Sequence, residues 1–472
     1  MESQLIESDL LESDLDSNLA DDESYTAESQ LETTPIDSTD ELDLFTDLEE
    51  TSPLYSNPLA MEGNHTEQPE DESPMPEDEA TDETSIMDVE TPEAESDVPL
   101  TNSVTAGNPE GTQFTFNFAE DTPQEVIDGV KEAAENWSSI LTDDVDINID
   151  FTFNPDETGL GTLGNTVSEY LTFGYGELNE ALAADATSAN DNTAIANLPE
   201  EELDILINNT SENSGSDTPY LDNNGGFNNS NVRITRANAK ALGIGLEDRA
   251  EELGVSVEEI AQIFNTVYPE FVVDPNSADA TINLSSNINW DFDSSDGINS
   301  DSFDFVGTVT HEIGHALGFE SNADVLDLVA NRNSDLLDLI NSANSEEISE
   351  LFAGTEAEAF VDAIVLDQFI SENEYLLQPF DFFRYTPESV EQGAIDFTAG
   401  NVDDKYFSID GGQTEIAPLS EGRNTGDMEQ LSHWEDNLGI GIMDPTGLPG
   451  ELLLETADTD LIAFDVIGWD LA

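Results

Sequence analysis

The segment from Thr310 to Phe319 reads T-H-E-I-G-H-A-L-G-F and contains two of the four histidines in this 472-residue chain. In an α-helix, residues four apart lie on one face, roughly 6 Å from each other. His311 and His315 can therefore bind one zinc ion if the segment is helical. Glu312 would lie beside the metal, where it can take a proton from a zinc-bound water. The motif predicts a helix and a hydrolytic zinc site.

The residues around this motif favour the same helix. An apolar stripe recurs at helical spacing and falls on a different face from the two histidines, at Val306, Val309, Ile313, Ala316 and Leu317. We expect Ser300, Asp301 or Ser302 to cap the start of the helix and Gly318 to end it. The alternative to a metal site is a buried helix whose two histidines make hydrogen bonds and have only a structural role.

A catalytic zinc ion takes three protein ligands and keeps a fourth position for water. His65 lies in a region that we predict to be disordered, so the remaining histidine is His433, in the sequence L-S-H-W-E. Two other sources of the third ligand stay open. Asp324 follows the motif closely, and Glu346 or Glu347 would complete a set of two histidines and one glutamate.

The run G-I-G-I-M-D-P that ends at Pro445 indicates a tight turn around Met443. Together with the histidine motif, it resembles the metzincin clan of zinc proteases, in which H-E-x-x-H-x-x-G-x-x-H is followed by a turn with a methionine beneath the metal. The match continues through Gly318 and stops at Ser321, where most members have their third histidine. Leishmanolysin-like members instead have an insertion after the glycine and a late third ligand within S-H-W. The chain is also similar to bacterial predicted metalloproteases with H-E-I-G-H-A-L-G-F, S-H-W, G-I-M-D-P and F-D-V-I-G-W-D.

This resemblance covers the chain from about Thr112 to its end. It implies a zinc-dependent endopeptidase that acts on polypeptides outside the cell. The residues that it implies are the metal ligands His311, His315 and His433, the general base Glu312 and the turn residue Met443.

Composition divides the chain at about residue 111. Residues 1–111 are rich in Asp, Glu, Ser, Thr and Pro, and no Lys or Arg precedes Lys131. Such a segment cannot bury enough apolar surface to offset its ordering entropy, so we predict a disordered acidic leader that is either a propeptide or a spacer. Because the chain has no cysteine, an inhibitory leader would have to block the zinc with an acidic side chain.

Residues 112–472 are expected to form an α+β, metzincin-like protease domain with a helical insertion over residues 322–378. Hydrophobic spacing predicts strands at Phe114–Phe118 and Val145–Phe153, a helix between them at Pro123–Leu141, and a closing helix at Thr459–Ile467. Ala278–Phe292 is a further strand region. In the clan, a strand in this place forms the sheet edge to which an extended substrate adds itself.

The formal net charge of −98, with only nine Lys and Arg, excludes nucleic acid as a natural partner. The acidic run Asp291–Asn299 suggests calcium as a second cation, with a solvated turn as the alternative. The first residues lack the basic and apolar regions of a signal peptide, and no segment is long enough to span a membrane. Export would need another route, and a cytoplasmic location stays open.

Two other functions compete with a protease. One is a catalytically inactive, acidic surface or matrix protein that binds cations with the same fold. The presence of Glu312 argues against it, because a scaffold has no need of a glutamate between the histidines. The other is a zinc hydrolase acting on compounds other than peptides, since the chemistry is shared. The oligomeric state and the natural substrate are not indicated by the sequence.

Overall fold

The computed structural model describes residues 59–63, 99–154, 162–200, 202–269, 271–330, 371–400, 404–423, 425–436, 438–453 and 456–472. These residues form an α+β fold with helices and mixed sheets, in agreement with the predicted class. No helix in these ranges has the length and apolar character needed to cross a membrane.

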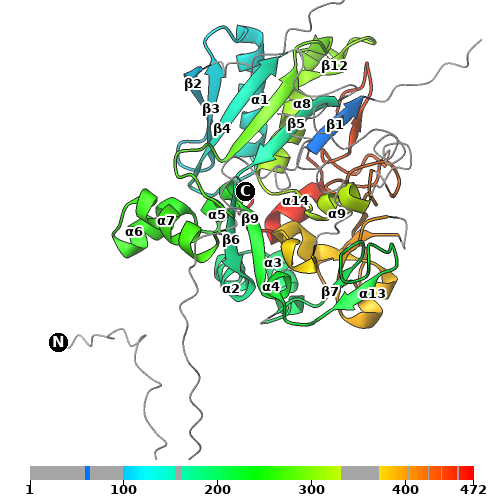
Figure 1. Ribbon diagram of the computed structural model, residues 1–472. Helices are drawn as coiled ribbons and strands as arrows, with labels where there is room; N and C mark the ends of the chain where they lie inside the picture. Colours follow the sequence, from blue (N-terminus) through cyan, green and yellow to red (C-terminus); the bar gives the residue numbers. More distant parts are fainter. Residues whose placement is uncertain are drawn as a thin grey trace, which may run out of the picture. The chain divides into compact units, whose positions relative to one another are not determined.

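A seven-stranded mixed sheet forms the upper part of the molecule in Figure 1, in the order β17-β1-β5-β10-β4-β3-β2. Strand β4 runs parallel to both of its neighbours, β3 and β10. Strand β5 runs antiparallel to both β10 and β1. The strands are β1 (Leu59–Gly63), β2 (Leu100–Gly107), β3 (Gln113–Ala119), β4 (Asp146–Asn154), β5 (Thr162–Ser168), β10 (Ala280–Ser285) and β17 (Thr446–Gly447).

Alternating apolar residues build the centre of this sheet. In β3, Phe114, Phe116 and Phe118 have no exposed surface, while the residues between them are half-buried. This period of two places one face of the strand against the helices. The strands predicted at Phe114–Phe118 and Val145–Phe153 are thereby confirmed as β3 and β4.

Two expectations about the sheet need correction. The strand region at 278–292 contains β10, but β10 lies inside the sheet between β4 and β5, so it cannot be the edge that receives a substrate. The sheet also includes β1 and β2, which lie in the segment defined as a disordered leader. Strand β2 is an edge strand with mostly half-exposed or exposed residues, so it lacks the apolar alternation that would have revealed it.

Helices α1 (Gln124–Ser138) and α8 (Phe305–Ala316) pack against each other and against strands of the large sheet (Figure 1). The buried indole of Trp137 in α1 donates a 2.8 Å hydrogen bond to the carbonyl of Thr310 in α8. It also packs edge-on against Phe464 of α14 (Asp458–Val466), with ring centroids 4.6 Å apart. Burial of each such aromatic ring stabilises the fold by about 1.5–3 kcal/mol. The predicted helices at 123–141 and 459–467 are confirmed as α1 and α14.

The remaining elements are short. The helices are α2 (Tyr175–Asp185), α3 (Ala189–Asn197), α4 (Phe227–Ser230), α5 (Arg236–Ala241), α6 (Leu246–Leu253), α7 (Val257–Val267), α9 (Ala323–Ala330) and α13 (Pro387–Gln392). Small sheets pair β6 (Tyr170–Gly174) with β9 (Asn231–Thr235), and β11 (Trp290–Asp291) with β12 (Phe303–Asp304). Two more combine β7 (Ile205–Ile207) with β8 (Tyr220–Asp222) and β14 (Ile395–Phe397), and β15 (Tyr406–Phe407) with β13 (Arg384–Tyr385) and β16 (Ala417–Pro418). Helix α9 lies at the start of the predicted insertion, whose residues 331–370 are outside the described ranges.

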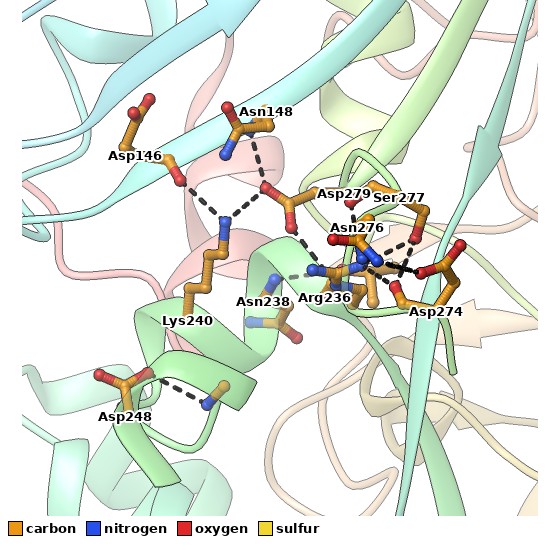
Figure 2. A network of polar contacts seen from close by, with 12 residues as sticks. Asp146, Asn148, Arg236, Asn238, Lys240, Asp248, Asp274, Asn276, Ser277 and Asp279 are labelled. Carbon is orange, nitrogen blue, oxygen red and sulfur yellow. Dashed lines mark hydrogen bonds and ion pairs between the residues drawn. The ribbon is translucent and has the colours of Figure 1, made fainter. Parts of the chain in front are cut away.

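A buried ionic cluster ties α5 to the large sheet (Figure 2). The carboxylate of Asp279, directly before β10, accepts hydrogen bonds from Lys240 Nζ at 2.6 Å and from the backbone N–H of Asn148 in β4 at 2.7 Å. Arg236 Nε lies 3.6 Å from the same carboxylate. Removing one partner of such a buried cluster typically costs about 3–5 kcal/mol, because the other charges stay buried. Two of the nine cationic side chains therefore serve to hold β4 and β10 in place.

Candidate metal centre

Helix α8 presents the H-E-x-x-H motif from the middle of the fold. It begins after Asp304, whose carboxylate accepts a 3.0 Å hydrogen bond from the backbone of Gly307. The cap thus lies two residues beyond the predicted positions 300–302, because Phe303 and Asp304 are extended as β12. The helix ends as predicted at Gly318, whose φ of +110° is strained for any residue with a side chain.

The structure brings together the three histidines expected as ligands. His315 Nε2 and His433 Nε2 lie 3.0 Å and 3.2 Å from His311 Nε2. Nitrogen atoms at the 2.0–2.1 Å typical of zinc, placed at tetrahedral angles, lie about 3.3 Å apart. The spacing of the three Nε2 atoms therefore fits a single metal ion, and among the described residues these three form the group able to hold one.

The hydrogen bonds on the far side of each ring explain why the Nε2 atoms converge. His311 Nδ1 lies 2.8 Å from the carbonyl oxygen of Ile442, and His315 Nδ1 lies 2.7 Å from that of Phe319. His433 Nδ1 lies 3.2 Å from the carbonyl oxygen of Gln430. A carbonyl only accepts, so each Nδ1 carries the proton and each Nε2 presents a lone pair. Three lone pairs directed at one another repel unless a cation lies between them.

Burial keeps these imidazoles neutral. All three side chains have no exposed surface. Burial lowers the pKa of His311 to about 4 and lowers the pKa of His315 and His433 well below the usual value. Neutral imidazole is the form that binds a metal, so the site is ready for a cation near neutral pH. Residues on every side of α8 are buried, so the face with the histidines is enclosed as well as the apolar stripe.

Two residues shortly after α8, Ser321 and Asp324, hold the loop that carries His433. Ser321 donates its backbone N–H to Ser432 Oγ at 2.8 Å and its hydroxyl to Asp381 at 2.6 Å. Asp324 accepts hydrogen bonds from Leu431 N at 2.7 Å and from the Ser432 hydroxyl. The carboxylate of Asp324 therefore holds the loop beside His433 and does not join the histidines. Glu346, Glu347 and His65 lie outside the described residues.

Met443 packs against helix α8 at the level of its two histidines. Gly314, between the two histidines of α8, has no side chain, and a Cβ there would lie 2.5 Å from Met443 Sδ. The backbone N–H of Trp434 donates to the carbonyl of Met443 at 3.1 Å, which ties the methionine turn to the residue after His433. The structure thus places Met443 against α8 and links it to the residue after His433.

Asp460 of α14 organises this turn and was not singled out from the sequence. Its buried carboxylate accepts hydrogen bonds from the Trp434 indole at 2.8 Å and from the backbone N–H of Ile442 at 2.9 Å. A Cβ at Gly441 would lie 2.2 Å from the same carboxylate, so only glycine fits there. Because α14 contains two further aspartates, Asp458 and Asp465, the sequence gives no signal that distinguishes Asp460.

Glu312 is fixed by strand β5. The Thr166 hydroxyl lies 2.7 Å from Glu312 Oε2 and 2.9 Å from the Glu312 carbonyl. Two positions earlier in the strand, a Cβ on Gly164 would lie 2.7 Å from Glu312 Oε1. Side chains two apart share one face of a strand, so Thr166 and Gly164 together shape the pocket of the glutamate. Neither residue carries a sequence signal that distinguishes it from the many other Thr and Gly residues.

The acidic run suggested as a calcium site closes a turn. Asp291 accepts hydrogen bonds from the backbone N–H of Asp293 at 3.1 Å and of Asn299 at 2.9 Å. These bonds lower the pKa of the Asp291 carboxyl. They give its oxygens partners within the turn, so the structure adds no support for calcium there.

Comparison with known proteins yields no relative. No protein-family model matches the chain, and no curated protein or solved structure matches it. The chemistry of the site follows from its own geometry.

Proposed function

We propose that this protein is a zinc-dependent endopeptidase with a metzincin-like site. The observation that carries the proposal is the convergence of three Nε2 atoms, with those of His315 and His433 at 3.0 Å and 3.2 Å from that of His311, the residue that precedes Glu312 in the chain. Three neutral imidazoles suit zinc and leave its fourth position for water. When bound, the zinc ion would act as a Lewis acid and lower the pKa of water.

The protein's own residues would supply the proton transfers. Glu312 follows His311 in α8 and lies one helical turn before His315, so its carboxylate is on the metal side of the helix. The Thr166 hydroxyl holds Glu312 Oε2 in place. We infer that Glu312 takes a proton from the attacking water and passes it to the departing amine.

The choice of polypeptides as substrates rests on strand β5. Both residues that shape the Glu312 pocket belong to this strand, so an extended chain paired with β5 would pass beside the general base. Main-chain hydrogen bonds to a sheet edge bind any extended peptide, whereas side-chain pockets set its sequence preference. Strand β5 would present such an edge once β1 is displaced, and a small non-peptide substrate would not use it.

Metal content and casein cleavage, measured on the full chain, test the proposal. Glu312→Gln should keep one zinc per chain and lose cleavage by at least about a hundredfold, the usual contribution of a general base. Glu320→Gln is a matched control, because Glu320 is a second buried glutamate whose carboxylate binds Ser168 and Tyr170. It should retain cleavage.

His433→Ala should lose most of the bound zinc. Normal zinc content in this variant would remove His433 from the ligand set. Cleavage retained by Glu312→Gln would overturn the proposed mechanism. Zinc binding without cleavage, both in the wild type and in a variant in which strand β1 is disrupted by proline substitutions, would favour the inactive cation-binding protein.

A further inference from the structure

A segment of the leader occupies the position beside β5. Strand β1 pairs with β5 in antiparallel orientation, with Leu59 opposite Thr166, Ala60 opposite Asn165 and Met61 opposite Gly164. Further along, it pairs in parallel with β17, through Glu62 to Thr446 and Gly63 to Gly447. Figure 1 shows β1 beside β5. Without β1, strand β5 would be an open edge.

The pairing passes next to the general base. Thr166 and Gly164, the β5 partners of Leu59 and Met61, are the two residues that shape the Glu312 pocket. Helix α8, which carries Glu312, also contacts β1. The other neighbour, β17, begins three residues after Met443 in the chain. The leader strand therefore lies between β5, whose residues contact Glu312, and β17, which follows the methionine turn; we call the position that it fills between these two strands the groove.

This groove suits an extended main chain. Strand β1 is central, with partners on both sides, so its backbone bonds in two directions. The register shifts between Met61 and Glu62, where the strand passes from its β5 pairing to its β17 pairing. Backbone pairing of this kind needs no metal-blocking side chain, in contrast to the acidic blocking group expected from the sequence.

The proposed catalytic residues are inaccessible to solvent while β1 is in place. Glu312 and the three histidines have no exposed surface. A polypeptide has to reach Glu312 in order to be cleaved, and β1 holds the strand position that such a polypeptide would take.

We propose that the groove between β5 and β17 is the polypeptide-binding site and that Leu59–Gly63 occupies it as an internal pseudosubstrate. The inhibitory role of β1 rests on the proposed endopeptidase activity. The presence of β1 between β5 and β17 does not depend on that activity. Displacement of β1 opens the site to other extended chains.

A disulfide trap tests the occupancy without any activity assay. Because the chain has no cysteine, Ala60→Cys/Asn165→Cys creates the only two thiols, at directly paired positions. Paired strand residues lie about 4.5–5.5 Å apart at Cα, within the range of a disulfide. Mild oxidation should cross-link most molecules. Ser38→Cys/Asn165→Cys is the control, with a leader thiol outside β1, and should cross-link far less. Equal cross-linking of the two pairs, or none at 60 and 165, would overturn the occupancy.

Proline substitutions test the inhibition in the full chain. Of the adjacent residues Ala60 and Met61, one directs its N–H at β5, so Ala60→Pro/Met61→Pro removes that donor, and the two proline rings also disfavour the pairing. The change should release β1 and raise casein cleavage about tenfold or more. Ser38→Pro/Thr39→Pro should leave cleavage at the wild-type level. In the cross-linked Ala60→Cys/Asn165→Cys protein, cleavage should fall below the wild-type level and recover on reduction. Unchanged cleavage in Ala60→Pro/Met61→Pro would overturn the inhibitory role.

A synthetic peptide of residues 57–66 separates this proposal from the function on which it rests. It should inhibit the proline variant competitively, whereas a scrambled peptide should not. Absence of cleavage in every variant would count against the endopeptidase, and the disulfide trap would still decide whether β1 occupies the groove. Cleavage that depends on Glu312 but ignores β1 and the peptide would overturn the pseudosubstrate alone.

Discussion

The Thr166 hydroxyl donates a hydrogen bond of 2.7 Å to Glu312 Oε2 and lies 2.9 Å from the carbonyl oxygen of the same residue. A strand residue thereby fixes both the side chain and the backbone of the proposed base. Because the bond uses one carboxylate oxygen, it sets the direction of the other. The position of the Glu312 carboxylate therefore depends on β5, the same strand that pairs with β1.

Thr166→Val keeps the shape of the side chain and removes the hydroxyl. In the chain opened by Ala60→Pro/Met61→Pro, we expect kcat to fall about 10- to 100-fold with little change in KM, since a positioned base contributes about 10²- to 10⁴-fold. Zinc content should stay at the level of the parent. Thr166→Ser restores the hydroxyl and should recover most of the rate. A lower zinc content in Thr166→Val would show that Thr166 supports the metal instead.

Asp324→Asn tests the loop that carries His433. The neutral amide weakens the bonds to Leu431 and Ser432, so we expect zinc affinity to fall about 10- to 100-fold, as for other residues that orient metal ligands. Asp327→Asn is the control, because Asp327 is a neighbouring buried aspartate whose carboxylate accepts hydrogen bonds from Thr425. Competition with a chromophoric chelator measures both affinities. Complete loss of zinc at any concentration would make Asp324 a direct ligand.

Gly314→Ala tests the contact between α8 and the methionine turn. The added Cβ would lie 2.5 Å from Met443 Sδ, so the sulfur has to move, and we expect a loss of about 1–3 kcal/mol in the free energy of unfolding. Gly176→Ala is the matched control, because its Cβ meets nothing within 4 Å in α2. Alanine is the better helix former by about 1 kcal/mol, so this variant should be as stable as the wild type or more so. Urea unfolding compares the two.

Asp143→Asn tests the effect of a buried carboxyl on pH dependence. Burial raises the pKa of Asp143 to about 7, so the folded protein binds more protons than the unfolded chain between about pH 4 and 7. The contribution of this group to stability therefore falls as pH rises through that window. Asparagine removes the effect, and we expect a gain on the order of 1–2 kcal/mol at pH 8 that disappears near pH 4.

The exposed neighbour gives the control for that measurement. Asp144→Asn removes the same charge from an exposed position and should change the midpoint of urea unfolding little at either pH. Equal gains in the two variants would attribute the effect to the net charge of −98 and not to burial.

Local patterns predicted the elements of the fold better than their arrangement. The alternation at Phe114–Phe118 and the helical spacing at 123–141 each reflect one buried face, so β3 and α1 follow from the sequence. The order of the sheet does not, because pairing of β10 between β4 and β5 joins segments far apart in the chain. Strand β1 was missed for the same reason: its residues gain their place from β5 and β17, not from their own apolar pattern.

The site divides in a similar way. His311, Glu312 and His315 were predictable because helical spacing alone puts them together. His433 required elimination among four histidines, and the structure then brought its Nε2 to 3.2 Å from that of His311. Thr166, Asp324 and Asp460 act through hydrogen bonds to residues far away in the sequence, and single polar residues of common types give no pattern that predicts such contacts.

The pairing of β1 with β17 also orders events in time. Strand β1 leaves the ribosome before β5, and β17 leaves it after His433. The pairing of β1 with β17 therefore forms only after all three histidines of the candidate metal centre have been synthesised. A nascent chain that ends before β17 can hold β1 through β5 alone.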